Sequence, residues 1–269
     1  MTADASAPVL LWFPALGVPA RKYDRLAAEL ATAGIACRVH EWRGTGMHPA
    51  RASRAVDWGY RDLLQEDIAA ELAQWRAANP GRPLLAGGHS IGGQFAVLAA
   101  ALHGGVDGLV VVGSGVPHWR LFPSPLRWLV AGFGQVLPPL TRLVGHYPGE
   151  ALRFAGREAG QLMRDWAGTV RRGDYDGLAG LPNDLSARLR QVEAPMLGVR
   201  LANDRLVPPA SLRALFGVTG SRAVTERVLD RQALGVADDH FAWMRAPAAV
   251  ATEVARWWAD SSATARFSP

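Results

Sequence analysis

Short apolar runs alternate with longer amphipathic segments along most of the chain. Six segments are predicted to be strands, namely 8–13, 35–42, 83–87, 109–112, 195–201 and 223–229. Of these, 8–13, 83–87 and 109–112 are apolar runs typical of buried strands. Between the six segments, apolar residues favour helices at about 20–33, 60–78, 94–102, 208–216 and 246–259. This alternation predicts an α/β fold with a mostly parallel sheet covered by helices on both faces. The polar tail from Asp260 is expected to fray.

Residues 116–192 interrupt this alternation. They contain no run that predicts a strand, and they hold many aromatic residues with several Pro and Gly. We expect two to four helices that form a cap over the sheet edge and line an apolar pocket, with residues 1–115 and 193–269 as the core. Residues 126–144 are quite apolar, but Arg127, Arg142 and the pair Pro138-Pro139 interrupt them. No stable membrane insertion is therefore predicted.

The composition of the 269 residues adds mainly exclusions. The net charge is +5, but the arginines are scattered and no basic run is interleaved with aromatic residues, which argues against nucleic-acid binding. The single cysteine, Cys37, excludes a disulfide within the chain. Residues 1–7 lack the basic and apolar regions of a signal peptide. We expect a cytoplasmic protein without metal or cofactor, and its oligomeric state stays open.

A serine stands where a buried strand turns into an Ala-rich helix, within Gly88-His89-Ser90-Ile91-Gly92. A nucleophile at such an apex needs small residues two positions before and after it, and Gly88 and Gly92 stand there. The Ile91 amide would point at the serine oxygen from the helix N-terminus, where partial positive charge gathers. The alternative is a turn serine that caps the helix. The flanking strand and helix favour the nucleophile.

A serine nucleophile needs a histidine base and a carboxylate that holds the base in the right tautomer. Four of the seven histidines are set aside by their predicted positions: His40 inside a strand, His89 in the turn but directed away from its apex, His103 at the far end of the helix, and His146 in the cap. His48, His118 and His240 remain. His240 lies between the last strand and the last helix, at the carboxyl edge of the sheet, and is the best candidate.

The carboxylate is assigned to Asp204, which ends a strand at the same edge. The order Ser90, Asp204, His240 is the one expected of this architecture. A turn or helix-capping role is the alternative for Asp204, and an exposed loop position is the alternative for His240. Asp238 and Asp239 are other possible carboxylates, but sequence neighbours of the base rarely have the required geometry, so we interpret both as solvated loop charges.

Two further parts of the site are predicted from position. The second oxyanion donor is expected to be the amide of Leu16, in the loop after the first strand, with Gly17 allowing the chain to turn. His118 and Trp119 directly follow a strand, enter the cap and are predicted to line the substrate pocket, although packing is an equal alternative for Trp119. A surface-loop role is favoured for His48 over a substrate contact.

These features resemble the α/β-hydrolase superfamily over nearly the whole chain. The matching residues are the turn around Ser90, Asp204 in Asn-Asp-Arg-Leu-Val-Pro and His240 in Asp-His-Phe. Arg43-Gly44-Thr45-Gly46 resembles a loop of esterases and lipases of the monoglyceride-lipase and serine-aminopeptidase type. Pro14-Ala15 departs from the His-Gly usual in the family, which alters the hydrogen bonds of that loop. The resemblance implies an α/β-hydrolase fold with a helical cap, and ester or related acyl hydrolysis.

The substrate is expected to be a small ester or acyl compound with an apolar acyl or aryl group, because the cap is apolar and aromatic. Three alternatives stay open. An acyltransferase or thioesterase would use the same triad, and a non-catalytic binding protein would share the fold. An aminopeptidase would need an anionic group in the cap, from among Glu150, Glu158, Asp165, Asp174 and Asp176. A serine nucleophile argues against haloalkane dehalogenase and epoxide hydrolase chemistry.

Overall fold

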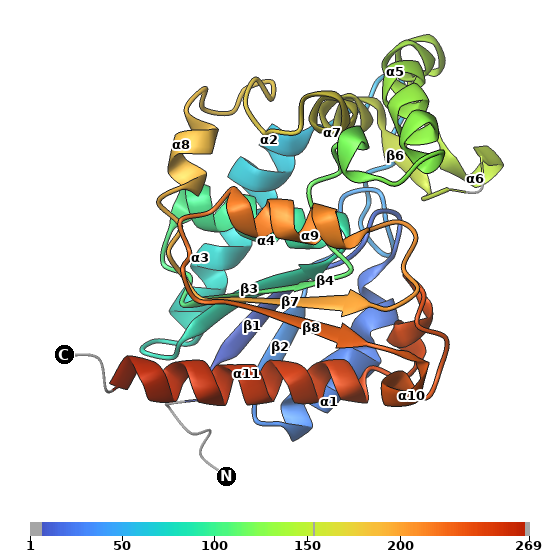
Figure 1. The fold of residues 1–269 in the computed structure, drawn as a ribbon. Helices are drawn as coiled ribbons and strands as arrows, with labels where there is room; N and C mark the ends of the chain where they lie inside the picture. The colour runs from blue at the N-terminus through green and yellow to red at the C-terminus, as the bar shows by residue number, and fades with distance from the viewer. Residues whose placement is uncertain (1–6, 153, 267–269) are drawn as a thin grey trace.

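The computed structural model describes residues 7–152 and 154–266. In this part of the chain six strands form one parallel sheet in the order β2-β1-β3-β4-β7-β8, which confirms the predicted sheet (Figure 1). Each strand corresponds to one of the six predicted segments: β1 (Val9–Phe13), β2 (Ala36–Val39), β3 (Leu84–His89), β4 (Gly108–Val112), β7 (Met196–Leu201) and β8 (Val224–Leu229). β2 is shorter than predicted, so His40 lies just past its end.

Apolar side chains cover both faces of the sheet. In β1, Leu11 and Phe13 enter one core and Leu10 and Trp12 enter the other, and none of the four is exposed. The first core includes side chains from α3 (Ala69–Ala78), α4 (Ile91–His103), α8 (Leu185–Leu189) and α9 (Pro209–Gly217). The second includes side chains from α1 (Asp24–Thr32) and α11 (Ala248–Arg266). Figure 1 shows α1 and α11 below the sheet and α4 and α9 above it.

Two predicted helices contain irregular turns. The helix at 60–78 consists of α2 (Tyr60–Asp62), a π-helical segment η2 (Leu63–Ile68) and α3. The helix at 20–33 begins with a 3-10 segment, η1 (Ala20–Tyr23), before α1. Two short segments precede α11, namely α10 (Arg231–Leu234) and the 3-10 segment η4 (Ala242–Arg245). Both η1 and η4 contribute side chains to the neighbourhood of the candidate site, as described below.

The segment after β4, called the cap below, leaves the sheet and lies at the upper right of Figure 1. It comprises η3 (Trp119–Leu121), α5 (Leu126–Val144), β5 (His146–Pro148), α6 (Gly149–Leu152), β6 (Arg157–Ala159) and α7 (Gly160–Arg172). Leu137, Tyr147, Met163 and Ala167 form a buried apolar cluster between α5, β5 and α7. Among the described residues, no helix has both the length and the hydropathy that are needed to cross a membrane.

Two expectations about chain segments are wrong. The region 116–192 does contain strands, because β5 and β6 pair in an antiparallel ladder. Each has three residues, too few for an alternating pattern to be visible in the sequence. The second error concerns the tail, because α11 continues past Asp260 to Arg266. A helix satisfies its backbone hydrogen bonds internally, so a polar segment rich in alanine can extend it.

Candidate active site

Ser90 lies at the sharp turn between β3 and α4. Its φ of 56° and ψ of −124° lie in a region that costs a residue with a side chain roughly 1–3 kcal/mol. A Cβ atom on Gly88 would overlap the backbone of Gly92, and a Cβ atom on Gly92 would overlap the carbonyl oxygen of Phe13. Both positions therefore require glycine, and the spacing Gly-x-Ser-x-Gly follows from this close approach of the backbone.

His240 and Asp204 are hydrogen-bonded to each other. Nδ1 of His240 lies 2.7 Å from Oδ2 of Asp204, and the two side chains are 6% and 2% exposed. An Nδ1–H donor leaves Nε2 able to accept a proton, and no hydrogen bond within the described chain occupies it. Oδ1 of Asp204 accepts the amide hydrogens of Leu206 at 2.8 Å and Val207 at 3.1 Å. Asp204 therefore also has the turn role that the sequence analysis gives as its alternative. The two bonds of this turn fix the carboxylate.

Of the two carboxylates beside His240, one agrees with the expectation of a solvated loop charge and the other does not. Asp239 is exposed and accepts two amides of its own loop. Asp238 is not a solvated charge, since it is 7% exposed and accepts the side-chain amide of Asn203 at 2.9 Å. The backbone N–H of Asn203 also donates to the Asp238 carbonyl at 3.1 Å. These bonds tie the loop that carries Asp204 to the loop that carries His240.

The loop after β1, which contains Pro14-Ala15, is held by two side chains from other segments. The Trp42 indole N–H donates to the Pro14 carbonyl at 3.0 Å, and the Ala15 amide donates to the Tyr23 hydroxyl at 2.9 Å. The next amide, that of Leu16, is bonded to no other residue in the described part of the chain. With Ala15 occupied, Leu16 offers the first amide of this loop that is available to a ligand.

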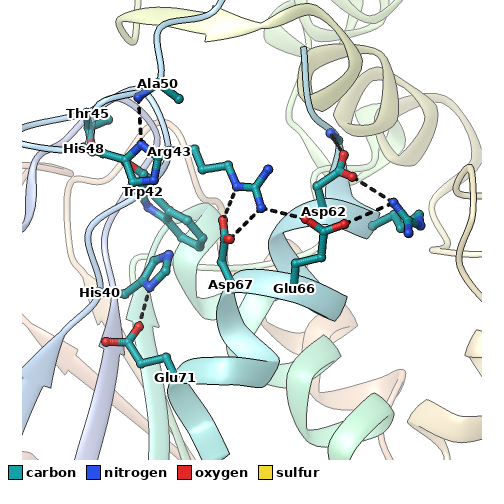
Figure 2. Close-up of polar contacts among 12 residues, drawn as sticks. His40, Trp42, Arg43, Thr45, His48, Ala50, Asp62, Glu66, Asp67 and Glu71 are labelled. Atoms are coloured by element: carbon teal, nitrogen blue, oxygen red, sulfur yellow. Dashed lines mark hydrogen bonds and ion pairs between the residues drawn. The ribbon is translucent and has the colours of Figure 1, made fainter. Parts of the chain in front are cut away.

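Figure 2 shows how the Arg43–Gly46 loop is held. Nε and Nη2 of Arg43 donate to the Asp67 carboxylate at 2.6 and 2.7 Å, and Nη2 also donates to Glu66 at 2.8 Å. Both carboxylates belong to η2, and their hydrogen bonds raise the pKa of Arg43. This ion-pair network anchors the segment beside Trp42, which supports the loop after β1. In the same figure, Nδ1 of His48 accepts the Ala50 amide, a contact within its own loop.

A cavity of about 560 Å³ opens beside Ser90. Its size is in the range of small-molecule binding sites. Ser90, His240, Leu16 and Ile91 line it from the core, and the residues that line it from the cap are mostly apolar: Phe122, Leu129, Val130, Phe133, Tyr147, Leu152, Phe154, Ala155 and Trp166. The described lining contains no Asp, Glu, Lys or Arg. Nor do the described residues hold a group of three or more His, Cys, Asp or Glu suited to a metal ion.

His118 and Trp119 do not line this cavity, although their neighbours Pro117 and Phe122 do. The His118 ring bonds through Nδ1 to the Val170 carbonyl at 3.1 Å. The Trp119 ring packs against Trp128, with 5.4 Å between the centroids. The chain enters the 3-10 segment η3 at this point, and that turn directs both side chains to other parts of the cap. Trp119 therefore packs within the cap, which is the alternative given for it in the sequence analysis.

The surroundings of His240 could not be predicted from the sequence. His89, for which the sequence predicts a side chain directed away from the apex of the turn, is fully buried and its ring centroid lies 4.6 Å from that of His240. Its Nδ1 lies 2.8 Å from the hydroxyl of Tyr23, which comes from η1. The Gly-His-Ser pattern identified His89 as part of the turn, but nothing in the sequence paired it with a tyrosine 66 residues away.

The cap touches the loop after β1 through its β5–β6 hairpin. Gly17, with a φ of 70°, lies so close to Gly156 that a Cβ atom on Gly17 would overlap it. Glu158 of β6 accepts the Gly156 amide at 3.1 Å and is 4% exposed. It borders a small void of about 10 Å³ together with Leu16 and Ile91. Burial raises the pKa of Glu158 to about 7.

The family described as serine aminopeptidase, S33, matches residues 6–232. The chain belongs to this family. It therefore has the α/β-hydrolase fold and is a hydrolase by family. The matched region contains Ser90 and Asp204 and ends before His240. No curated protein matches the chain.

Solved structures agree in fold at low sequence identity. BpoC from Mycobacterium tuberculosis H37Rv is 15% identical with a TM-score of 0.63, over 96% of this chain and 94% of that one. The pyrethroid hydrolase PytH is 18% identical with a TM-score of 0.60, over 96% and 99% of the two chains. A monoacylglycerol lipase from Paleococcus ferrophilus is 19% identical with a TM-score of 0.58, over 83% and 86%.

The buried Glu158 predicts a pH dependence of stability. Its pKa rises from 4.5 to about 7 on folding, so the folded state holds a proton that the unfolded state has released. The free energy of unfolding should therefore fall as pH rises from about 4.5 to 7, by on the order of 3 kcal/mol. Glu158→Gln keeps an oxygen that accepts the Gly156 amide and removes the ionisation, so its free energy of unfolding should not fall in this way. Urea denaturation should find it more stable than wild type at pH 8, with the difference shrinking at pH 5.

The exposed Glu150 of α6 supplies the control, because Glu150→Gln removes a carboxylate of the same cap without changing a buried group. Its stability relative to wild type should not change between pH 5 and pH 8. An equal difference for Glu158→Gln at the two pH values would show that Glu158 does not titrate in this range.

Proposed function

We propose that the chain is a serine hydrolase that cleaves carboxylic esters bearing an apolar acyl or aryl group. The observation that carries the proposal is the Asp204–His240 hydrogen bond at a cavity that also contains Ser90 and is otherwise mostly apolar. Family membership supports hydrolysis. The strained backbone of Ser90 supports its role as nucleophile, because such strain persists where the surrounding structure sustains it and is common at active sites.

In the proposed acylation step, Oγ of Ser90 attacks the ester carbonyl carbon while Nε2 of His240 takes its proton. Asp204 holds the Nδ1–H and stabilises the imidazolium that forms. The negative charge moves to the carbonyl oxygen. The Ile91 amide, at the start of α4, and the Leu16 amide are the donors proposed to bind it.

The tetrahedral intermediate then collapses. The bond to the leaving alkoxide breaks, and His240 returns the proton to that oxygen, so an alcohol departs and the acyl group stays on Ser90. Water enters and gives its proton to His240 as it attacks the acyl carbon. Ser90 leaves with that proton and a carboxylic acid is released. Each step uses the same two amides and the same base.

The composition of the cavity supports the substrate class and weighs against an aminopeptidase. A substrate amine would need an anionic partner, and no described lining residue is acidic. Three of the five carboxylates considered for that role are engaged elsewhere. Asp165 accepts the Tyr60 amide, Asp174 pairs with Arg172, and Asp176 bonds to Ser186. The solved relatives named as a monoacylglycerol lipase and a pyrethroid hydrolase accord with an ester substrate.

Ser90→Ala is expected to lower kcat/KM for short p-nitrophenyl esters by a factor on the order of 10⁴ or more, because the nucleophile is lost. Ser114→Ala is the matched control. Ser114 is buried, its hydroxyl has no hydrogen-bond partner in the described chain, and it does not line the cavity. That variant should retain wild-type activity. Equal ester turnover by Ser90→Ala and wild type would refute the assignment.

The same assay separates the alternative functions when esters, acyl-CoA thioesters and aminoacyl amides are compared, with and without an added alcohol. The proposal predicts fastest turnover of apolar esters, with water as the acceptor. Faster turnover of acyl-CoA would indicate a thioesterase, and product ester formed with the alcohol would indicate an acyltransferase. Release of amino-terminal residues would indicate a peptidase. A folded wild-type protein without any turnover would indicate a binding protein.

Asp204→Asn is expected to lower kcat by a factor on the order of 10⁴, since an amide does not hold the imidazole in the required tautomer. Asp239→Asn, one residue from His240, keeps the oxygen that accepts its loop amides and should lower kcat less than about twofold. Steady-state kinetics of the two variants on one ester test this. A greater loss in Asp239→Asn than in Asp204→Asn would contradict the assigned carboxylate.

A further inference from the structure

One tyrosine hydroxyl connects two parts of the candidate site. Tyr23 ends η1 and is 1% exposed. Its hydroxyl oxygen accepts the Ala15 amide hydrogen at 2.9 Å and lies 2.8 Å from Nδ1 of His89. The amide can only donate, so the oxygen accepts there. The phenolic hydrogen is then free to donate to Nδ1 of His89.

This bond defines the protonation state of His89. A ring nitrogen that accepts the phenolic hydrogen carries no proton, so the neutral ring holds its proton on Nε2. Nε2 has no side-chain hydrogen-bond partner in the described chain. The Tyr23 hydroxyl is thus the side chain that selects the tautomer. Burial, followed by the nearby His240, keeps the pKa of His89 well below its ordinary value.

The neutral ring of His89 forms the surface on which His240 rests. The two ring centroids are 4.6 Å apart at an interplanar angle of 40°. Trp243 of η4 completes the packing, with its ring centroid 5.2 Å from that of His89 and its indole N–H donating to the His240 carbonyl at 3.1 Å. A positive charge on His89 would repel the imidazolium that His240 must become during acyl transfer.

We propose that Tyr23 is a positioning residue for both halves of the reaction centre. By accepting the Ala15 amide, its hydroxyl fixes the loop so that the Leu16 amide is the one offered to the developing oxyanion. By donating to His89, it holds a neutral imidazole against His240. The inference rests on the proposed function, because positioning has a kinetic meaning only if Ser90 and His240 carry out acyl transfer.

Three titratable groups surround His89, and they determine which pH effects are expected. Tyr23 approaches from η1, His240 from the loop before η4, and Asp204 lies behind His240, to which it is bonded. Burial raises the pKa of Tyr23 far above its usual range, so its hydroxyl keeps its proton at working pH. Removing the hydroxyl leaves Nδ1 of His89 without its donor and therefore more ready to bind a proton.

Tyr23→Phe should therefore lower kcat about tenfold with little change in KM, because two buried hydrogen bonds are lost away from the substrate. The acid limb of the kcat/KM profile should also move to higher pH, since protonated His89 disfavours protonation of His240 in the transition state. Tyr60→Phe is the control. Tyr60 is equally buried, and its ring packs on Phe95. It should keep the wild-type kcat and pH profile, whatever its thermal stability.

Substitution of His89 separates positioning from packing. His89→Gln offers a carbonyl oxygen to the Tyr23 hydroxyl, whereas His89→Leu fills similar space without an acceptor. The proposal predicts that His89→Gln retains at least tenfold more kcat than His89→Leu. Equal activity of the two variants would mean that the hydrogen bond has no catalytic effect.

A spectroscopic measurement on the ¹⁵N-histidine-labelled enzyme gives a readout independent of turnover. His89 should appear as the neutral Nε2–H tautomer from pH 5 to 9 in wild type, and it should bind a proton within this range in Tyr23→Phe. A wild-type His89 protonated on Nδ1, or a Tyr23→Phe enzyme with unchanged kcat and acid limb, would overturn the inference alone. Wild-type protein without any hydrolysis would overturn the proposed function and the inference with it.

Discussion

The backbone around Ser90 is packed so closely that no side chain fits at the positions two residues before and two residues after it. Gly88 meets the first turn of α4, and Gly92 meets the end of β1 at Phe13. Ser90 must therefore adopt a positive φ, at a cost of roughly 1–3 kcal/mol. The strained conformation persists because β3 and most of α4 are buried, and their packing offsets this free energy. This contact sets where α4 begins, and hence where its free N-terminal amides meet the loop after β1.

The remaining parts of the candidate site are arranged around that fixed point. The loops after β7 and β8 are joined by the Asn203–Asp238 bonds, which hold Asp204 and His240 as one unit. The loop after β1 is held by Trp42 and Tyr23. The core therefore carries the polar groups assigned to the chemistry. The cap supplies much of the apolar wall, so specificity is expected to lie there.

Patterns that depend on local constraints could be predicted from the sequence. The strands β1, β3, β4 and β7 appear as apolar segments because nearly all of their side chains are buried, and the turn at Ser90 appears because the close backbone approach requires glycine. Contacts between distant segments left no such trace. The burial of Asp238 depends on Asn203, 35 residues earlier, and the partner of His89 lies 66 residues away. The β5–β6 ladder has three residues in each strand, too few for a periodic signal.

The central claim is that Ser90 becomes covalently acylated, and a fluorophosphonate tests it most directly because the adduct it forms with an activated serine is stable. Intact-mass and peptide-mapping measurements should find one equivalent of label on Ser90 in wild type, and none in Ser90→Ala. Label on another residue, or no label on folded protein that hydrolyses esters, would contradict the account.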